Sequence, residues 1–229
     1  MRLHPEANIQ THTFGEEHAP IVVIDNFVDD PGSLIEAATR EDFTTTQRYF
    51  PGVRAEAPRE YRRFLLGELQ PLLFDVFELE GESLGFSMCH FSIVTTPPEQ
   101  LMTLQRIPHV DTVQRNALAS IHYLFTGDLG GTAFYRHRST GFESVDESRR
   151  ARYLVALESE LEIDSNVPAA YIDGDTALFE RIAVWHGMFN RLLVYRRNSL
   201  HSGSIAAGFP CDADPRTGRL SINTFIDVN

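Results

Sequence analysis

The residues from Gly85 to the C-terminus form a succession of short runs rich in β-branched and aromatic side chains, and this pattern limits the fold more than any other feature of the sequence. The runs are separated by proline, glycine and aspartate. They are GFSMCHFSIVTT, LQRIPHV, ALASIHYLFT, GTAFYRH, TALFERIAV, FNRLLVY and RLSINTFIDV. Runs of this length and composition, bounded by turn-forming residues, predict β-strands. So many short strands are typical of a β-sandwich or a β-barrel.

Helical patterns precede and interrupt the predicted strands. Residues 21–27 predict a strand, and residues 29–33 break it before a short helix begins. Over residues 59–79 apolar side chains recur at helical spacing, and Pro71 is expected to kink or divide this helix. A capping box, SVDE, opens a predicted helical insertion near residues 144–165.

Length and composition define the class of protein. With 42% hydrophobic and 23% charged residues, the chain is expected to be globular. We expect one domain over residues 1–229, in which residues 1–84 supply an N-terminal strand and flanking helices and residues 85–229 supply the core. The formal net charge of -12 repels phosphate backbones and anionic membrane surfaces, so neither nucleic acid nor a membrane is an expected partner.

The sequence also favours a cytoplasmic location. Its first 18 residues lack the apolar core of a signal peptide. No apolar run approaches the roughly 18 residues that span a bilayer. Cys89 and Cys211 are too few for a disulfide framework, so we expect both to be reduced thiols.

The segment IPHVDTV places His109 and Asp111 two residues apart in a run of strand-like composition. Alternate residues of a strand share a face, so an imidazole nitrogen and a carboxylate oxygen could meet one metal ion there. An iron site of the two-histidine, one-carboxylate type needs a second histidine from another strand. A His-X-Asp pair also arises by chance, which leaves a metal-free strand face as the alternative. The candidates for the second histidine are His90, His122, His137, His186 and His201.

Two further runs, SLHSGS at residues 199–204 and RLSINTFI after it, complete an ordered pattern. The chain resembles the Fe(II)/2-oxoglutarate-dependent oxygenase superfamily, in particular its prolyl-hydroxylase-like branch. In that superfamily a double-stranded β-helix carries His-X-Asp on an early core strand, a distal histidine on the penultimate strand and a basic residue on the last. His109, Asp111, His201 and Arg219 match these positions in order. The runs GGTAFYRHRSTGFE, FNRLLVY and LHSG resemble an uncharacterised bacterial family within the superfamily.

The resemblance implies a mainly β fold with flanking helices around a double-stranded β-helix, or jelly-roll, core. It implies Fe(II) bound by His109, Asp111 and His201, with 2-oxoglutarate and O2 as co-substrates, and hydroxylation of an unactivated C–H bond in a small molecule or a peptide side chain. Halogenating relatives lack the carboxylate at the position of Asp111, so hydroxylation is favoured over halogenation. The alternatives are a cupin-like metal enzyme that does not use 2-oxoglutarate and a non-catalytic binding protein on the same fold.

A strand that begins at Arg219 places Arg219 and Ser221 on one face. A guanidinium group forms a two-pronged ion pair with a carboxylate, and a nearby hydroxyl adds a donor, which suits the distal carboxylate of 2-oxoglutarate. Two features depart from the superfamily pattern: the long gap between His201 and Arg219, and the insertion around residues 144–170. The other arginines that could bind this carboxylate are Arg216, Arg136 and Arg138.

Overall fold

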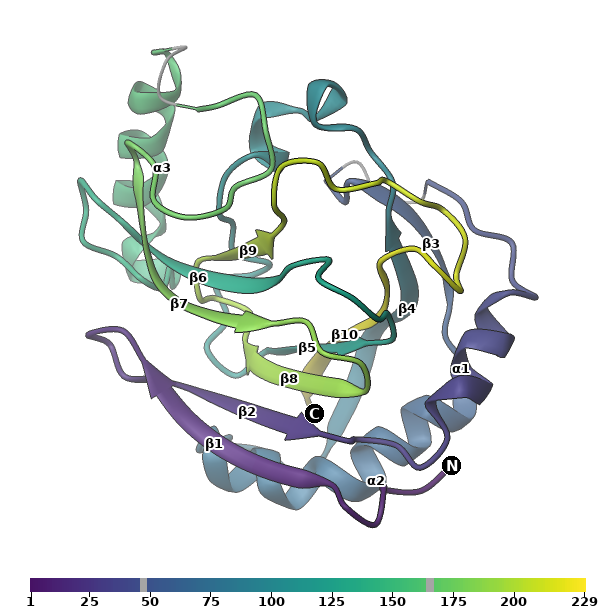
Figure 1. Cartoon of the computed structure of the whole chain (residues 1–229). Helices are drawn as coiled ribbons and strands as arrows, with labels where there is room; N and C mark the ends of the chain where they lie inside the picture. Colours follow the sequence, from purple (N-terminus) through teal and green to yellow (C-terminus); the bar gives the residue numbers. More distant parts are fainter. Residues whose placement is uncertain (46–48, 164–166) are drawn as a thin grey trace.

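The computed structural model describes residues 1–45, 49–163 and 167–229, and its described strands form two antiparallel sheets (Figure 1). The larger sheet contains, in spatial order, β1 (Asn8–Phe14), β2 (Ala19–Asp25), β8 (Arg191–Arg196), β5 (Leu118–Tyr123), β10 (Leu220–Val228), β4 (Leu84–Val94) and β3 (Gly52–Glu56). The smaller sheet contains β7 (Phe179–His186), β6 (Gly131–His137) and β9 (His201–Ser204). This arrangement confirms the predicted mainly β fold with a jelly-roll core.

Each strand of the larger sheet sends alternate side chains to two separate cores, because neighbouring side chains of a strand point to opposite faces. Val22, Leu192 and Ile222 pack on the outer face, against the helices α1 (Pro31–Ala38) and α2 (Arg59–Val76). Ile21 and Leu193 pack on the inner face, against the smaller sheet. The two sheets therefore enclose a space between them, and the helices seal the far side of the larger sheet.

The third helix covers the smaller sheet. α3 (Glu147–Leu161) packs Tyr153 and Leu157 against side chains of β6 and β7, and Figure 1 shows it at the edge of the molecule opposite α1. Two short 3-10 turns, η1 (Pro98–Gln100) and η2 (Thr103–Gln105), follow β4. Among the described residues, no helix combines the length and the apolarity needed to cross a bilayer.

Most predicted elements are present, and four predictions need correction. The run LQRIPHV, residues 104–110, is not a regular strand; it begins in η2 and contributes an isolated β-bridge at His109. α2 continues through Pro71 without being divided. β1 and β3 were not predicted, because β1 is a largely exposed strand of mostly polar residues and β3 is only five residues long. The fourth correction concerns the start of α3.

Asp146, and not Ser144, caps the N-terminus of α3. The Asp146 side chain accepts a hydrogen bond from the backbone N–H of Arg149 and lies beside the guanidinium of Arg115. These donors, together with the hydroxyl of Ser148, hold the pKa of Asp146 below its usual range. Ser144 instead forms a β-bridge with Ser199, so its backbone is still extended where the predicted capping box would have started the helix.

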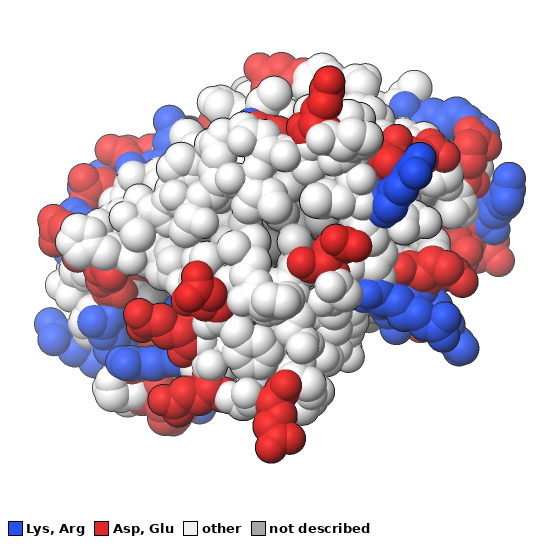
Figure 2. Space-filling model, turned by 90° about the horizontal axis from the view of Figure 1, so that it is seen from below, with Lys and Arg blue, Asp and Glu red and all other residues white. Residues whose placement is uncertain are grey.

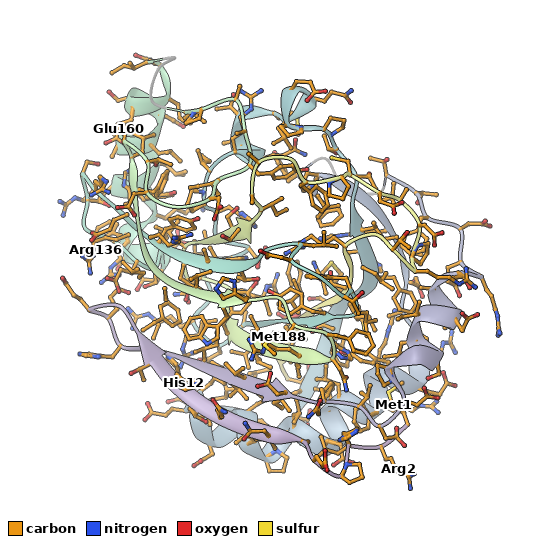
Figure 3. The ribbon with its side chains drawn as sticks, in the orientation of Figure 1. Met1, Arg2, His12, Arg136, Glu160 and Met188 are labelled. Atoms are coloured by element: carbon orange, nitrogen blue, oxygen red, sulfur yellow. The ribbon has the colours of Figure 1, made fainter. Side chains whose placement is uncertain are left out.

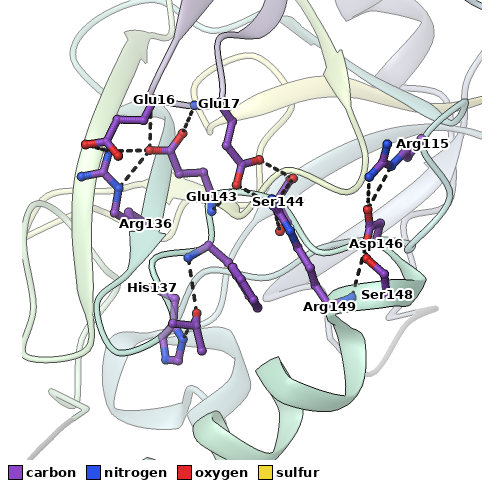
Figure 4. Close-up of polar contacts among 12 residues, drawn as sticks. Glu16, Glu17, Arg115, Arg136, His137, Glu143, Ser144, Asp146, Ser148 and Arg149 are labelled. Atoms are coloured by element: carbon purple, nitrogen blue, oxygen red, sulfur yellow. Dashed lines mark hydrogen bonds and ion pairs between the residues drawn. The ribbon is translucent and has the colours of Figure 1, made fainter.

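A buried carboxylate ties the β1–β2 hairpin to this region (Figure 4). Glu143 is 2% exposed, and its carboxylate accepts hydrogen bonds from the backbone N–H groups of Glu16 and Glu17 and from the side chain of Arg136. The turn passes so close that a side chain at Gly15, where φ is 69°, would overlap the Glu143 carboxylate. Glycine therefore meets both the conformational and the spatial requirement of this turn.

Candidate metal centre and cavity

Backbone hydrogen bonds bring His109 and His201 together. The N–H of His109 donates to the carbonyl of His201 at 2.9 Å, and the N–H of His201 donates back at 3.0 Å. Two residues further on, the N–H of Asp111 donates to the carbonyl of Arg197 at 2.9 Å. The His-X-Asp segment thus pairs with the chain at and before β9, although it is too short to count as a strand.

The side chains of His109, Asp111 and His201 converge. Each offers one ligand atom, and these three atoms lie within 4.8 Å of one another. The Nε2 atom of His109 is 3.7 Å from Oδ1 of Asp111, and Nε2 of His201 is 3.6 Å from Oδ2. Two imidazole nitrogens and one carboxylate on one side of an ion are the donor set of non-haem Fe(II) sites with open positions.

The hydrogen bonds around the triad also suit a metal ion. Nδ1 of His201 lies 2.9 Å from the carbonyl oxygen of Ser199, and a carbonyl only accepts, so Nδ1 carries the proton and Nε2 keeps its lone pair. Oδ2 of Asp111 is buried and has no hydrogen-bond partner among the described residues. A buried carboxylate oxygen without a partner is costly, and a bound cation would remove that cost.

The pKa of His109 is lowered to about 4, first by desolvation and then by the neighbouring His201. The His109 side chain is 53% exposed, but the surface it exposes faces the cavity described below, so protein surrounds the ring even though part of it is accessible. Because of this lowered pKa, the ring is neutral at physiological pH, which is the form that binds metals.

A cavity of about 750 Å³ lies between the two sheets, and the triad forms part of its wall. Arg219 lines the same cavity and is 4% exposed. Its Nε donates to the carbonyl of Leu129 at 2.8 Å and its Nη2 to the carbonyl of Gly131 at 2.9 Å, which fixes the guanidinium just before β10. Burial lowers its pKa, but an arginine remains charged.

Ser221, the other predicted cofactor residue, is 2% exposed and is not among the described residues that line the cavity. Its hydroxyl donates to Oδ1 of Asn223, whose side chain does reach the cavity wall. Ser221 therefore contacts a residue of the cavity wall, Asn223, and does not itself line the cavity.

The three rival arginines have other partners. Arg216 forms an exposed ion pair with Glu36 at 3.2 Å. Arg136 pairs with Glu143 and lies toward the edge of the molecule near α3 (Figure 3). Arg138 pairs with Asp175. Of the four arginines considered from the sequence, Arg219 is the one that lines the cavity.

The remaining candidate histidines lie outside the cavity wall. His122 is buried on the outer face of the larger sheet, where its ring stacks on Tyr61 and its Nε2 lies 3.0 Å from Oδ1 of Asn190. His137 pairs with Glu160 at 2.7 Å. His90 is half-buried on β4, and His186 is exposed at the end of β7.

Among the residues that sequence reasoning missed in the cavity are Tyr195 and Arg54. The centre of the Tyr195 ring, on β8, lies 4.9 Å from the centre of the His201 ring. Burial, and then Asp111, raises the pKa of Tyr195 well above the usual value, so its hydroxyl stays protonated. The alternation in FNRLLVY could have placed it on the inner face with Leu193. Arg54 also lines the cavity, but it lies on β3, a strand that was not predicted.

Comparison of the sequence with family profiles identifies the family of this chain. The family profile described as "Family of unknown function (DUF6445)" matches residues 5–226. The chain belongs to this family. The predicted resemblance to an uncharacterised family is thereby confirmed. No curated protein matches the DUF6445 chain in sequence.

Solved structures identify the fold of this DUF6445 protein. HygX from Streptomyces hygroscopicus with nickel and 2-oxoglutarate bound is 13% identical, with a TM-score of 0.51, over 93% of this chain and 84% of HygX. The HygX structure that also contains hygromycin B has a TM-score of 0.52 at 12% identity, over the same shares of the two chains. SnoN, a non-heme alpha-ketoglutarate-dependent epimerase from nogalamycin biosynthesis, has a TM-score of 0.52 at 10% identity, over 91% of this chain and 78% of SnoN. The fold is therefore that of the Fe(II)/2-oxoglutarate-dependent oxygenases.

Proposed function

We propose that this protein is a non-haem Fe(II)- and 2-oxoglutarate-dependent dioxygenase that hydroxylates an unactivated C–H bond of a small molecule or a peptide side chain. The observation that carries the proposal is the convergence of His109, Asp111 and His201 on the wall of a cavity that Arg219 also lines. The fold supports it, since HygX, the neighbour with 2-oxoglutarate bound, also accommodates a small molecule, hygromycin B.

Each residue has a defined part in this proposal. His109, Asp111 and His201 would hold Fe(II), which supplies the oxygen-activating chemistry together with 2-oxoglutarate. Arg219 would pair with the distal carboxylate of 2-oxoglutarate, and the carbonyls that it contacts keep its guanidinium in position. The protonated hydroxyl of Tyr195 is available as a hydrogen-bond donor beside His201.

Asp111 supports hydroxylation over halogenation as the proposed reaction. A carboxylate at this position fills the place that a halide ion occupies in halogenating relatives, so hydroxylation is the proposed reaction. The surrounding side chains fix the distance between the substrate and the metal, and that positioning is the main contribution of the protein.

The test is an anaerobic titration of the metal-free protein with Fe(II) and then with 2-oxoglutarate, followed by the visible charge-transfer band of the chelate. We expect the band in the wild type, its loss in His109→Ala, and its retention in His186→Ala, where an exposed histidine outside the cavity is removed. Iron binding without the band would favour a cupin-like enzyme instead. Failure to bind iron would leave a non-catalytic protein on the same fold.

A further inference from the structure

A second arginine, Arg54, lines the cavity from β3, an edge strand of the larger sheet. Strand register places Tyr123, Ser221, Ser92 and Arg54 in one row across β5, β10, β4 and β3. The side chain of Arg54 is 7% exposed and lines the cavity. Its guanidinium lies over the ring of Phe50, 4.1 Å from the ring centre. The row thus ends in a buried cation within the cavity.

Arg54 is charged and already makes contacts within the wall. Burial lowers its pKa to about 10, while Asp111 raises it, so the group is a cation at neutral pH. Its Nη1 donates to the sulfur of Met88 at 3.4 Å. A guanidinium group has five N–H donors, so it can bind a further acceptor beside these contacts.

The charge of the cavity changes when the proposed cofactors bind. Among the described residues that line it, the charged side chains are Arg54, Asp111 and Arg219. The charges of Fe(II) and Arg219 would be balanced by Asp111 and the two carboxylates of 2-oxoglutarate. The sum over these described lining groups is then one positive charge.

Much of the remaining cavity wall is apolar, and part of it comes from the insertion that follows β6. α3 contributes Tyr153, Leu154 and Leu157, and Tyr49 and Leu104 also line the cavity. Three of these side chains are at the rim and remain accessible: Tyr49 is 63% exposed, Leu104 47% and Leu154 40%. A ligand that enters past them meets apolar surface first and the arginine deeper inside.

We propose that Arg54 determines substrate specificity, and that the substrate is an amphipathic carboxylic acid whose carboxylate pairs with Arg54 while its apolar body contacts the α3 side of the cavity. This inference rests on the proposed dioxygenase function. A guanidinium group provides a planar pair of donors that fits a carboxylate, and an amide of the same shape lacks the negative charge.

The experiment compares acids with their amides. Octanoate and octanamide, and 4-phenylbutyrate and its primary amide, are titrated calorimetrically into the anaerobic Fe(II)/2-oxoglutarate complex, and the charge-transfer band is followed in parallel. We expect each acid to perturb the band and to bind at least about tenfold more tightly than its amide. Arg54→Gln should abolish that preference, Arg54→Lys should restore part of it, and Arg216→Gln, an exposed arginine variant, should leave it intact.

Several results would overturn the inference: equal binding of acid and amide, binding of neither, or an acid preference that survives in Arg54→Gln. Loss of the 2-oxoglutarate band in Arg54→Gln would also overturn it, because Arg54 would then bind the co-substrate. If Arg54→Gln does not fold, the preference for acid over amide is compared between the wild type and Arg54→Lys. An unchanged preference in Arg54→Lys would then overturn the inference.

Failure of the proposed function is a separate result, seen as absence of the band in the wild type. In that case the acids and amides are titrated into metal-free protein, where Arg219 is the competing cation. An acid preference that is lost in Arg54→Gln and kept in Arg219→Gln supports the assignment of Arg54, and the reverse pattern rejects it.

Discussion

At the scale of single residues, buried polar groups decide most of the behaviour of the cavity. Arg219 illustrates this, because its guanidinium serves two purposes: it satisfies the carbonyls of Leu129 and Gly131, and it presents positive charge to the cavity. Removing it should therefore affect both stability and the binding of a carboxylate.

For Arg219→Met we expect the affinity for 2-oxoglutarate to fall by about tenfold to a hundredfold, the range for a charge-assisted hydrogen bond. Stability should also fall, by about 1–3 kcal/mol, because two carbonyls lose their donor. The anaerobic titration measures the first effect and denaturant unfolding the second. Arg216→Met is the matched control, since the exposed ion pair of Arg216 with Glu36 contributes little to stability. Unchanged 2-oxoglutarate affinity in Arg219→Met would contradict the assignment.

His122 should make the stability of the fold sensitive to acid. Burial lowers its pKa to about 4 in the folded protein, whereas an unfolded chain has a histidine pKa of about 6.5. As the pH falls below about 6.5, the unfolded state binds a proton that the folded state does not. Stability is thus full above that pH and is lost as the pH falls toward 4, by about 1.4 kcal/mol for each pH unit.

The variant His122→Phe preserves a ring next to Tyr61 and Phe27 but cannot bind a proton. We expect the free energy of unfolding of this variant to depend less steeply on pH between about 6.5 and 4.5 than that of the wild type, by up to one proton. Denaturant unfolding of metal-free protein at several pH values measures the slope. Identical slopes would show that His122 takes up its proton in the folded state as readily as in the unfolded one.

At the scale of elements, α3 is the part of the fold that departs from the superfamily pattern and also forms a wall of the cavity. Its position depends on how the chain leaves β6 and begins the helix. Asp146 fixes that start through the N–H of Arg149 and the side chain of Arg115. Ser144, two residues earlier, belongs to the extended segment that pairs with Ser199.

Asp146→Ala should lower the free energy of unfolding by about 1–2 kcal/mol, as expected for loss of an N-cap. Ser144→Ala should cost less, because the hydroxyl there makes exposed contacts with Glu17 and caps no helix. Denaturant unfolding of the two variants side by side tests the difference. A larger loss for Ser144→Ala would mean that the capping box read from the sequence holds the helix in solution.

At the scale of the whole molecule, the candidate metal centre joins distant parts of the chain. His109 and Asp111 lie in an irregular segment, and His201 begins β9 after β5, β6, β7 and β8 have intervened. Figure 2 shows one face of the molecule, on which most of the charged side chains, both acidic and basic, lie toward the margins of a largely uncharged central area. The absence of a nucleic-acid partner stays a prediction from the net charge of -12.

Because a metal ion would bind the folded triad and not the unfolded chain, divalent metal should stabilise the whole molecule. We expect Fe(II), or redox-inactive Mn(II), at a hundred times its dissociation constant to raise the free energy of unfolding by about 2.7 kcal/mol. Thermal unfolding with and without a chelator measures this. The shift should disappear in His201→Ala and persist in His186→Ala; an equal shift in both variants would place the metal elsewhere.

The sequence by itself determined the fold class and the members of the triad. Strand composition and turn residues are local properties, so β4 to β10 could be predicted, and the order of His109, Asp111, His201 and Arg219 along the chain carried the resemblance that placed them together. What only the tertiary structure decided depends on pairing between distant segments. The segment around His109 forms a β-bridge and not the predicted strand. Arg219 lines the cavity, whereas its rivals pair elsewhere, and Arg54 lines the cavity from an edge strand. Register across a sheet is set by the packing of both faces, and no short stretch of sequence contains that information.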